Sequence, residues 1–456
     1  MTMLFERAEG RMKSMEKRKM RLSAFTPGSS YHQAGWRHPQ SDLSVYEDFS
    51  RWVTIAKKLE AAKFDMIFIA DTASPAKASE PEVFRRLAGG DQFEPMTLLA
   101  ALSAHTTHLG LAGTIPTSYR PPYDAARELL SLDRISGGRG GWNIVTGISP
   151  DDGAQYADQI HPPQSERYAR GEEFVDVVLK LWASVQPGAY IRDKDSGVFK
   201  DLEKIRLINH VGKYYNVRGP LAGLASPQGR PVTVQAGQSE DGRALASRVA
   251  EAVFTAQSTF EQAKAFRDDI RSRAAAWGRN PDHLKLLPGV IMVVGETRQE
   301  AEDKWGEMDS FLDMQAAMAA LQLNLKHIDL STHDLDAPFP DVPPEAVVSR
   351  GSHLVEAAKK EGLSLRQVLV RSAGANAHFT LKGTAKDIAD ELQHWFEDGA
   401  CDGFNVQTAV SPVSLDDILE KVVPELQRRG LFRTEYEFRT LRENLGIPAD
   451  TIPLRY

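Results

Sequence analysis

The stretch AGQSEDGR combines a glycine, a serine and the start of a helix in an order that suits anion binding. Gly237 lets the backbone approach a ligand closely, and Ser239 is a typical residue for capping the helix behind it. The free N–H groups of that first helical turn offer partial positive charge to a phosphate. These residues predict a phosphate site, against the plainer interpretation of an ordinary capped turn between a strand and a helix.

A second glycine-rich stretch, GGRGGWNIVTG, covers residues 137–147. A dinucleotide-binding fingerprint has Gly-x-Gly-x-x-Gly after a strand, whereas these glycines come before the apolar run. If Gly138 and Gly140 were its first two glycines, the third would fall on Asn143. The sequence also lacks the Gly-Lys-Ser/Thr of a P-loop. The stretch is instead typical of a helix end, a tight turn and a following strand.

Polar residues and a glycine also follow several apolar runs. Asp71 ends IFIAD, Thr114 lies in GTIPTS, and Asn143 and Gly147 lie in WNIVTG. In a barrel of parallel strands, the residues at the carboxyl ends of the strands form the working face. These four are therefore candidate ligand-binding residues, with a simple helix cap as the alternative for Asp71.

The spacing of the histidines does not indicate a metal site. His105 and His108 stand three apart in HTTH, but no carboxylate or cysteine lies close enough in the sequence to complete a site, so no metal is expected. His32 and His38 flank a loop after the first expected strand, which is a suitable place to contact a substrate. No Gly-x-Ser-x-Gly nucleophile motif is present.

Composition narrows the function classes. The chain has 456 residues, of which 42% are hydrophobic, and its 55 Lys and Arg against 62 Asp and Glu are interleaved, which argues against a nucleic-acid surface. The single cysteine, Cys401, excludes an internal disulfide framework and suits a reducing cytoplasm. No apolar run reaches about 18 residues, so no membrane span is expected.

Short apolar runs alternate with segments of helical period along the chain. The expected strands cover residues 20–25, 66–70, 109–115, 142–146, 232–236, 253–256, 286–294 and 403–407. The expected helices cover residues 46–62, 95–105, 122–134, 166–182, 240–250, 260–277, 298–311, 385–396 and 417–427. Eight strand–helix units favour an α/β fold in the form of a closed (β/α)8 TIM barrel over a doubly wound sheet.

Residues 1–19 are expected to form a charged extension, and residues 20–456 a single barrel domain. Two intervals do not fit the repeat and predict insertions at about 184–229 and 313–374. The first contains INHVGKYYNVRGPL, which is typical of a hairpin. The second contains the Met- and Ala-rich MQAAMAALQLNLKHI, which predicts either a lid over an apolar substrate or packing between subunits.

Seven stretches together resemble one family of flavin enzymes. They are AFTPGSSYHQAGWRHP, KFDMIFIAD, TSYRPPYDAARELLSLDRISGGRGGWNIVTG, SERYARGEEFVDVVLKLW, INHVGKYYNVRGPL, SPQGRPVTVQAGQSEDGR and DGFNVQ, in the family's order. The family is the nitrilotriacetate monooxygenase, pristinamycin synthase and dibenzothiophene-sulfone monooxygenase group of the bacterial luciferase superfamily. The resemblance runs from about residue 20 to beyond residue 430.

The resemblance implies a luciferase-like barrel that binds reduced FMN (FMNH2) from a separate NAD(P)H:FMN reductase. Reduced FMN would react with O2 to give a C4a-(hydro)peroxide, which passes one oxygen atom to a small organic substrate. The missing dinucleotide fingerprint agrees with an external reductase. A homodimer or homotetramer is expected.

The resemblance also implies roles for single residues. Those expected to bind the flavin and its phosphate are Asp71, Thr114, Asn143, Gly147, Gln164, Tyr168, Gly237 and Ser239. The candidates for hydrogen bonding to the departing oxygen are His32 and Asn143, with His378 behind them.

Two positions depart from the family pattern. Gln164 stands where the family usually has a histidine four residues before Tyr168, so the phosphate loses a cationic neighbour. Ile148 stands where some members, among them the alkane enzyme, have a histidine after the fourth strand. The second departure argues against an alkane-type site.

Three alternatives remain open from the sequence. One is a deazaflavin-dependent oxidoreductase of the same superfamily, one a non-catalytic flavin-binding protein, and the last a metal-dependent barrel hydrolase. The identity of the substrate does not follow from the residues.

Overall fold

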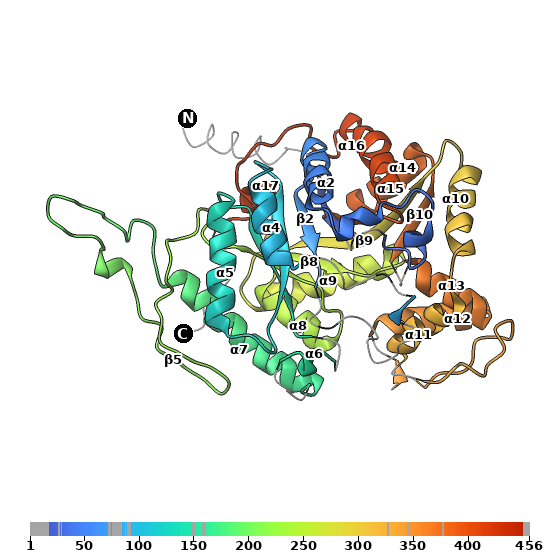
Figure 1. The fold of residues 1–456 in the computed structure, drawn as a ribbon, viewed down its shortest axis with the longest axis horizontal. Helices are drawn as coiled ribbons and strands as arrows, with labels where there is room; N and C mark the ends of the chain where they lie inside the picture. The colour runs from blue at the N-terminus through green and yellow to red at the C-terminus, as the bar shows by residue number, and fades with distance from the viewer. Residues whose placement is uncertain are drawn as a thin grey trace, which may run out of the picture.

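A computed structural model describes residues 18–25, 28, 30–71, 74, 84–86, 88, 93–147, 151–156, 161–325, 328–343, 346–347, 349–375 and 378–449. A closed barrel of eight parallel strands lies at its centre (Figure 1). These strands are β1 (Arg21–Phe25), β2 (Met66–Ile69), β3 (Gly110–Pro116), β4 (Gly140–Val145), β7 (Val232–Gln235), β8 (Ala252–Thr255), β9 (Lys285–Val294) and β11 (Gly403–Gln407). Each pairs with the next in that order, and β11 pairs with β1 to close the ring. The predicted barrel is confirmed.

One more strand of the sheet was not predicted. β10 (Phe379–Gly383) pairs in parallel with residues 290–294 of β9, beyond the part of β9 that pairs with β8. β9 is ten residues long, so its carboxyl-terminal half extends past β8 and offers a free edge. β10 therefore adds to the barrel rim without entering the ring of eight.

Helices cover the outside of the barrel, as the periodicity predicts. The main ones are α2 (Phe49–Ala61), α4 (Pro95–Ser103), α5 (Pro122–Ile135), α7 (Gln164–Ala183), α8 (Glu240–Val249), α9 (Phe260–Ala276), α10 (Arg298–Ser310) and α14 (Ala385–Glu397). The last expected helix differs from the prediction, since it starts earlier and has a π-helical middle. It consists of α15 (Val413–Asp417), five π-helical residues at Ile418–Val422, and α16 (Val423–Arg428).

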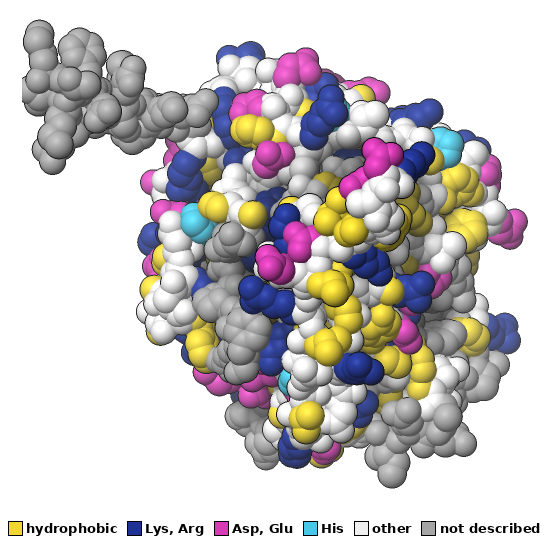
Figure 2. Space-filling model, turned by 90° about the vertical axis from the view of Figure 1, so that its left-hand side faces the viewer, with side chains coloured by type: hydrophobic (Ala, Val, Ile, Leu, Met, Phe, Trp, Pro, Cys, Tyr) yellow, Lys and Arg dark blue, Asp and Glu magenta, His cyan; other side chains and the backbone are white. Residues whose placement is uncertain are grey.

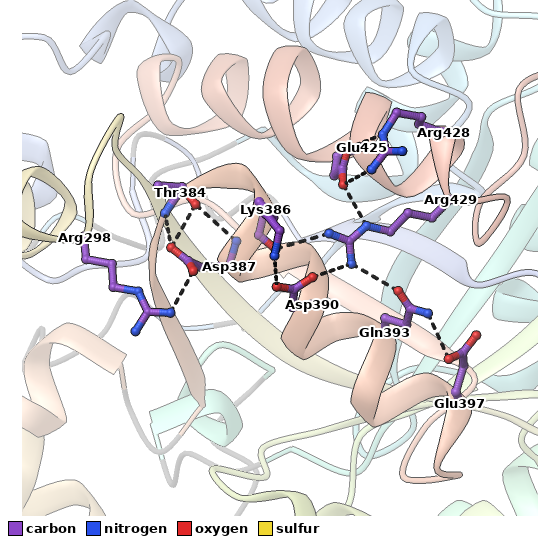
Figure 3. A network of polar contacts seen from close by, with 10 residues as sticks. All are labelled: Arg298, Thr384, Lys386, Asp387, Asp390, Gln393, Glu397, Glu425, Arg428 and Arg429. Carbon is purple, nitrogen blue, oxygen red and sulfur yellow. Dashed lines mark hydrogen bonds and ion pairs between the residues drawn. The ribbon is translucent and has the colours of Figure 1, made fainter.

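Charged side chains tie three of these helices together at the surface (Figure 3). Asp387 of α14 accepts a hydrogen bond of 2.7 Å from Arg298 of α10 and caps its own helix with Thr384. Arg429, just after α16, donates to Gln393 of α14 at 3.1 Å and to Glu425 at 2.8 Å. Exposed pairs of this kind contribute little energy each, but here they form a connected network.

The GGRGG stretch has a structural role. Gly137 and Gly138 have φ angles of +72° and +93°, which reverse the chain between α5 and β4. Arg139 is buried and donates to the carbonyl oxygens of Leu109 at 2.7 Å and Ser103 at 3.0 Å, so its guanidinium satisfies backbone acceptors near the end of α4. This confirms a turn into the fourth strand.

Apolar side chains fill the amino-terminal end of the barrel. Leu441, Leu445 and Ile447, in and after α17 (Leu441–Asn444), pack with inward-facing strand residues such as Met66 and Val232. The amino-terminal end is therefore closed, and the carboxyl ends of the strands are left to carry a site.

Both intervals expected as insertions have structure of their own. β5 (His210–Val211) and β6 (Asn216–Val217) pair antiparallel, which confirms the hairpin in INHVGKYYNVRGPL. In the second interval, α11 (Met314–Asn324), α12 (Ser349–Glu361) and α13 (Leu365–Ala375) surround a separate small core that includes Ala317, Leu321 and Leu369. Figure 1 shows this three-helix group at the opposite end of the molecule from β5.

Candidate active site

Thr114 and Asn143 form a hydrogen-bonded pair at the carboxyl ends of β3 and β4. Asn143 Nδ2 donates to Thr114 Oγ1 at 2.8 Å, and Thr114 Oγ1 donates to the carbonyl oxygen of Ile69 at 3.0 Å. These two hydrogen bonds fix the orientation of the Asn143 amide. Its Oδ1 atom is left as an acceptor. Oδ1 is buried and has no hydrogen-bond partner in the described structure. A buried acceptor left in this way suits a ligand that carries an N–H donor.

The predicted phosphate residues meet at the start of α8. Ser239 caps this helix, since its Oγ accepts from the backbone N–H of Gly242 at 3.2 Å. A Cβ atom on Gly237 would lie 2.5 Å from Gln235 Nε2 and 3.1 Å from Tyr168 Oη. Only a glycine therefore fits at 237, and its backbone lies directly below the Tyr168 hydroxyl. This arrangement suits a phosphate.

Gln164 lies beside the same helix end but points to a carboxylate. Its Nε2 donates to Asp241 Oδ2 at 3.3 Å in an exposed position. The negative charge in the first turn of α8 is partly neutralised, because Glu240 forms an ion pair of 2.6 Å with Arg273. The proposed phosphate contact of Gln164 stays a prediction.

The amino-terminal half of α7 connects the two halves of this site. A Cβ atom on Gly171 would lie 3.0 Å from both Thr117 Oγ1 and Thr146 Cγ2, so α7 approaches the ends of β3 and β4 closely. Tyr168 is one turn earlier on the same helix and reaches Gly237. The helix thus positions residues of β3, β4 and the β7–α8 turn relative to one another.

His161 lies beside Gly147, which has a φ angle of +76°. A Cβ atom on Gly147 would lie 3.6 Å from His161 Cε1. His161 Nδ1 lies 2.6 Å from Tyr119 Oη, whereas its Nε2 is buried without a hydrogen-bond partner in the described structure. Burial, and then the charge of Arg167, lower the pKa of His161. A neutral imidazole with one free nitrogen therefore faces the loop after β4.

No pattern in the sequence marks His161 as a site residue. It directly precedes the two prolines of IHPPQ, and it comes 14 positions after Gly147, so no local spacing connects the two. Ile148, expected at the position where some members of the family have a histidine after the fourth strand, lies outside the described residues.

Asp71 lies just after β2, at the carboxyl end of the barrel. Its charge contributes to a raised pKa at Tyr156, for which burial is the larger cause. Tyr156 stacks on Tyr119 with ring centroids 5.2 Å apart, which connects Tyr156 to the Tyr119 and His161 pair. The role of Asp71 in holding the flavin stays a prediction.

The opposite half of the barrel mouth is aromatic. Phe25 and Phe254 stack with centroids 5.7 Å apart, and His378 also stacks on Phe254, with centroids 5.3 Å apart. Gln407 ends β11 within this group, and both of its amide atoms are buried without a hydrogen-bond partner in the described structure. A Cβ atom on Gly289 would lie 2.6 Å from Gln407 Nε2, so the glycine makes room for this amide. Gln407 was not among the predicted site residues.

His32 is placed apart from the phosphate end. Its side chain is fully buried, its Nε2 lies 3.1 Å from Asp309 Oδ1 of α10, and its Nδ1 accepts from the backbone N–H of Ala34 at 3.2 Å. Both ring nitrogens are thus occupied by protein groups. This geometry favours Asn143 over His32 as the group that contacts the reacting centre, and the role of His32 stays a prediction.

Two features are absent from the described part of the chain. No group of three or more His, Cys, Asp or Glu side chains is arranged to hold a metal ion there. No helix there is long and apolar enough to cross a lipid bilayer.

Comparisons with known proteins agree with the barrel and identify a family. Residues 20–402 match the family model described as luciferase-like monooxygenase. Nitrilotriacetate monooxygenase component A of Aminobacter aminovorans is 42% identical over 438 residues, which cover 94% of this chain and 97% of the relative. This confirms the resemblance seen in the sequence.

Two solved structures have the same fold over nearly the whole chain. The structure of DmoA from Hyphomicrobium sulfonivorans has a TM-score of 0.84 and 33% identity, with 94% of this chain and 92% of that chain covered. A riboflavin lyase with modified FMN and riboflavin has a TM-score of 0.81 and 30% identity, and the match covers 94% of this chain and 96% of that chain. The fold, the family match and the relatives together show that this chain belongs to the luciferase-like monooxygenase family.

Proposed function

We propose that this chain is the oxygenase component of a two-component monooxygenase. It binds reduced FMN supplied by a separate NAD(P)H:FMN reductase and uses O2 to place one oxygen atom on a small organic substrate. One observation carries the proposal. The buried Asn143 acceptor and the glycine-lined start of α8 lie at the same end of a barrel whose family is monooxygenases.

The residues present suit a phosphorylated flavin. Gly237, Ser239 and Tyr168 form a polar cradle for the phosphate, and the Gly237 Cβ position is filled by neighbouring atoms. Thr114, Asn143, Gly147 and Asp71 lie at the ends of the preceding strands and would surround the isoalloxazine ring. When bound, reduced FMN supplies the electrons that activate O2.

The protein contributes orientation and exclusion of water. Thr114 holds the Asn143 amide so that Oδ1 would be available to accept a hydrogen bond from a bound flavin. Asn143 is the preferred contact to the reacting centre, and His161 Nε2 is a second polar group on the same side. The aromatic group around Phe254 provides a largely apolar wall for the substrate, and His378 and Gln407 add polar groups to it.

Two further points belong to the proposal. The relative is named component A, which supports a separate partner protein that delivers the reduced flavin. We also propose a cytoplasmic location, which suits the buried, unpaired Cys401, and a homo-oligomeric assembly. Nitrilotriacetate monooxygenase component A, at 42% identity, supports a monooxygenase over the deazaflavin and hydrolase alternatives.

A charge change at Ser239 tests the phosphate site. Aspartate caps helices as well as serine does, so Ser239→Asp keeps α8 intact but sets a negative charge against the phosphate. We expect affinity for reduced FMN, measured anaerobically by equilibrium dialysis, to fall at least about a hundredfold. Two negative charges placed side by side, the new carboxylate and the phosphate, cost several kcal/mol.

Two controls accompany this test. Ser239→Asn caps the helix without charge, and Thr297→Asp places the same charge at the N-cap of α10, which Thr297 forms outside the site. Thr297→Asp should bind reduced FMN within about threefold of the wild type, because its charge lies outside the site. Ser239→Asn should lose much less affinity than Ser239→Asp, because it sets no charge against the phosphate. Unchanged affinity of Ser239→Asp would move the phosphate elsewhere.

A further inference from the structure

Four neighbouring strands, β8, β9, β11 and β1, are described in full and bring no charged side chain to the carboxyl end of the barrel. β1, β8 and β11 end in Phe25, Thr255 and Gln407, and β9 is uncharged after its first residue, Lys285. The remaining charge on these strands, Arg21, lies at the amino-terminal start of β1. The outer surface is different, since Lys, Arg, Asp and Glu are scattered over the face in Figure 2. This half of the barrel mouth is therefore uncharged where the strands end.

The same strands carry a flat aromatic surface. The ring of Phe254 stacks on that of Phe25 with an interplanar angle of 24° and on that of His378 with an angle of 8°. Tyr31 meets Phe25 edge-on, with ring centroids 5.9 Å apart. Phe25 and Tyr31 are only partly buried, so part of this aromatic surface is accessible from outside the protein. Stacked rings of this kind pack well against a planar apolar molecule.

Gln407 lies among these rings as an amide that the fold leaves unsatisfied. Its side chain is 0% exposed, and neither Nε2 nor Oε1 has a hydrogen-bond partner in the described structure. The absence of a side chain at Gly289 leaves room for it, because a Cβ atom there would lie 2.6 Å from Nε2. Buried polar atoms without partners destabilise a folded protein. This amide therefore suits a ligand that accepts from Nε2 and donates to Oε1.

A second amide in the same condition lies close by in the fold. Both amide atoms of the Gln33 side chain are also buried without a hydrogen-bond partner among the residues described. Gln33 belongs to the loop after β1, and this loop runs over the end of β11, because the backbone N–H of Tyr31 donates to Thr408 O at 2.8 Å. Two unsatisfied amides thus occur where one loop meets the end of one strand. This grouping favours a bound polar molecule over an isolated packing defect.

Gln407 lies across the barrel from the residues proposed to hold the flavin ring. In the ring of eight strands, β11 is four strands from β4 in either direction, so Gln407 and Asn143 are on opposite sides of the mouth. The interior of an eight-stranded barrel is only a few side chains wide. A molecule held by Gln407 and the aromatic rings would therefore lie beside a flavin held by Asn143.

These features define the chemistry of the molecule that fits here. A carboxylate would find no cation on the four strands, and burying an uncompensated charge is strongly unfavourable. A neutral molecule avoids this, and an amide or lactam group satisfies both polar atoms of Gln407 at once. We propose that Gln407 selects the substrate of the proposed monooxygenase, and that this substrate is a flat, neutral molecule with an amide-like polar group. The inference rests on the proposed function for the reaction, whereas the selection itself is a property of binding.

Three probes of similar size test this selection in calorimetric titrations of the full chain. 2-Quinolone is flat and neutral and has adjacent N–H and C=O groups, naphthalene has no polar group, and 2-naphthoate is ionised at neutral pH. We expect the wild type to bind 2-quinolone at least about tenfold more tightly than either of the others. Naphthalene leaves the Gln407 amide unsatisfied, and 2-naphthoate buries a charge.

Gln407→Leu removes the amide and keeps a side chain of similar volume. We expect its affinity for 2-quinolone to fall at least about tenfold and its affinity for naphthalene not to fall. Its melting temperature should not fall either, because leucine takes two unsatisfied polar atoms out of the interior. An amide that only stabilised the fold would give the opposite result for the melting temperature.

Gln228→Leu is the matched control. The amide of Gln228 is also buried, but it donates to Gly140 O at 2.9 Å and accepts from the backbone N–H of Arg442 at 3.0 Å, near the amino-terminal start of β4. This variant should lose stability and keep the wild-type preference for 2-quinolone, because its amide has partners in the protein and lies away from the barrel mouth.

The outcomes separate this inference from the proposed function. A wild type that does not bind 2-quinolone, or that binds 2-naphthoate as tightly, would overturn the inference. So would a Gln407→Leu variant that keeps the preference or melts at a clearly lower temperature. The titrations are made without oxygen, both with and without reduced FMN. Failure of reduced FMN to bind would remove the proposed monooxygenase and leave the preference for 2-quinolone in place.

Discussion

Asn143 Nδ2 donates to Thr114 Oγ1 at 2.8 Å, across the paired strands β4 and β3. The hydroxyl of Thr114 donates its proton to the carbonyl oxygen of Ile69. Its oxygen can therefore only accept a hydrogen bond from the Asn143 amide. The orientation of the amide at the barrel mouth is therefore set by a residue on the neighbouring strand.

Thr114→Val should weaken the binding of reduced FMN. Valine keeps the shape of threonine but removes the acceptor, which leaves the Asn143 amide free to turn and costs about 1–3 kcal/mol, or roughly five- to a hundredfold in affinity. Anaerobic titration with reduced FMN measures this affinity. Thr54→Val is the control, because Thr54 Oγ1 donates only to the backbone oxygen of Ser50 on the exposed side of α2 and should have no effect on FMN. Equal affinities for the two variants would separate Thr114 from the site.

Gly237→Ala should impair flavin binding without unfolding the protein. The new Cβ would lie 2.5 Å from Gln235 Nε2 and 2.8 Å from Gly242 Cα, so the turn before α8 must shift. Gly306→Ala is the matched control, since nothing lies within 4 Å of its Cβ position in α10, and alanine there should be neutral or stabilising by up to about 1 kcal/mol. If both variants bind reduced FMN like the wild type, the close approach at residue 237 has no role.

His161 should titrate below the usual range for histidine. Burial, followed by the positive charge of Arg167, lowers its pKa, so the ring is neutral at pH 7 and gains its proton only in more acidic solution. An NMR titration of the ring proton, assigned by loss of the signal in His161→Asn, gives the midpoint directly. A midpoint above the ordinary value of about 6.5 would contradict the environment described here.

Asp133 should make the protein less stable as the pH rises through weakly acidic values. Burial, opposed by hydrogen bonds from Ser226 and Gln228, raises its pKa from 3.8 to about 6. Between these values the folded state keeps a proton that the unfolded state has lost, so stability falls with rising pH and is level above the folded pKa.

The variant Asp133→Asn isolates this effect. The free energy of unfolding of the wild type, relative to that of the variant, should drop by about 3 kcal/mol between roughly pH 4 and pH 6. Urea unfolding across this range provides the values. A constant difference would show that Asp133 titrates normally. Asp133 lies near the amino-terminal start of β4, away from the site, so flavin affinity should not follow this change.

The sequence predicts the barrel well because its signals are local. Each strand of the ring is a short apolar run next to a helix of clear period, and Ser239 and Gly237 lie within one recognisable turn. β10 escaped prediction because FTLKG is short and only partly buried, and its pairing depends on the unusual length of β9. The sequence does not predict contacts between residues that are distant along the chain, as at His161, His32 and Gln407. The partners that decide their roles, such as Asp309, which lies 277 positions from His32, come together only through the fold.

The central claim is that the barrel mouth holds reduced flavin and controls its reaction with oxygen. Photoreduced FMN is bound to the protein without oxygen, mixed with O2 in a stopped-flow instrument, and followed by the returning absorbance of oxidised flavin. We expect this absorbance to return clearly more slowly than with free FMN, and the trace of an Asn143→Ala variant to move towards the rate of free FMN. A wild-type trace that coincides with that of free reduced FMN, at protein concentrations that bind all of it, would contradict the account.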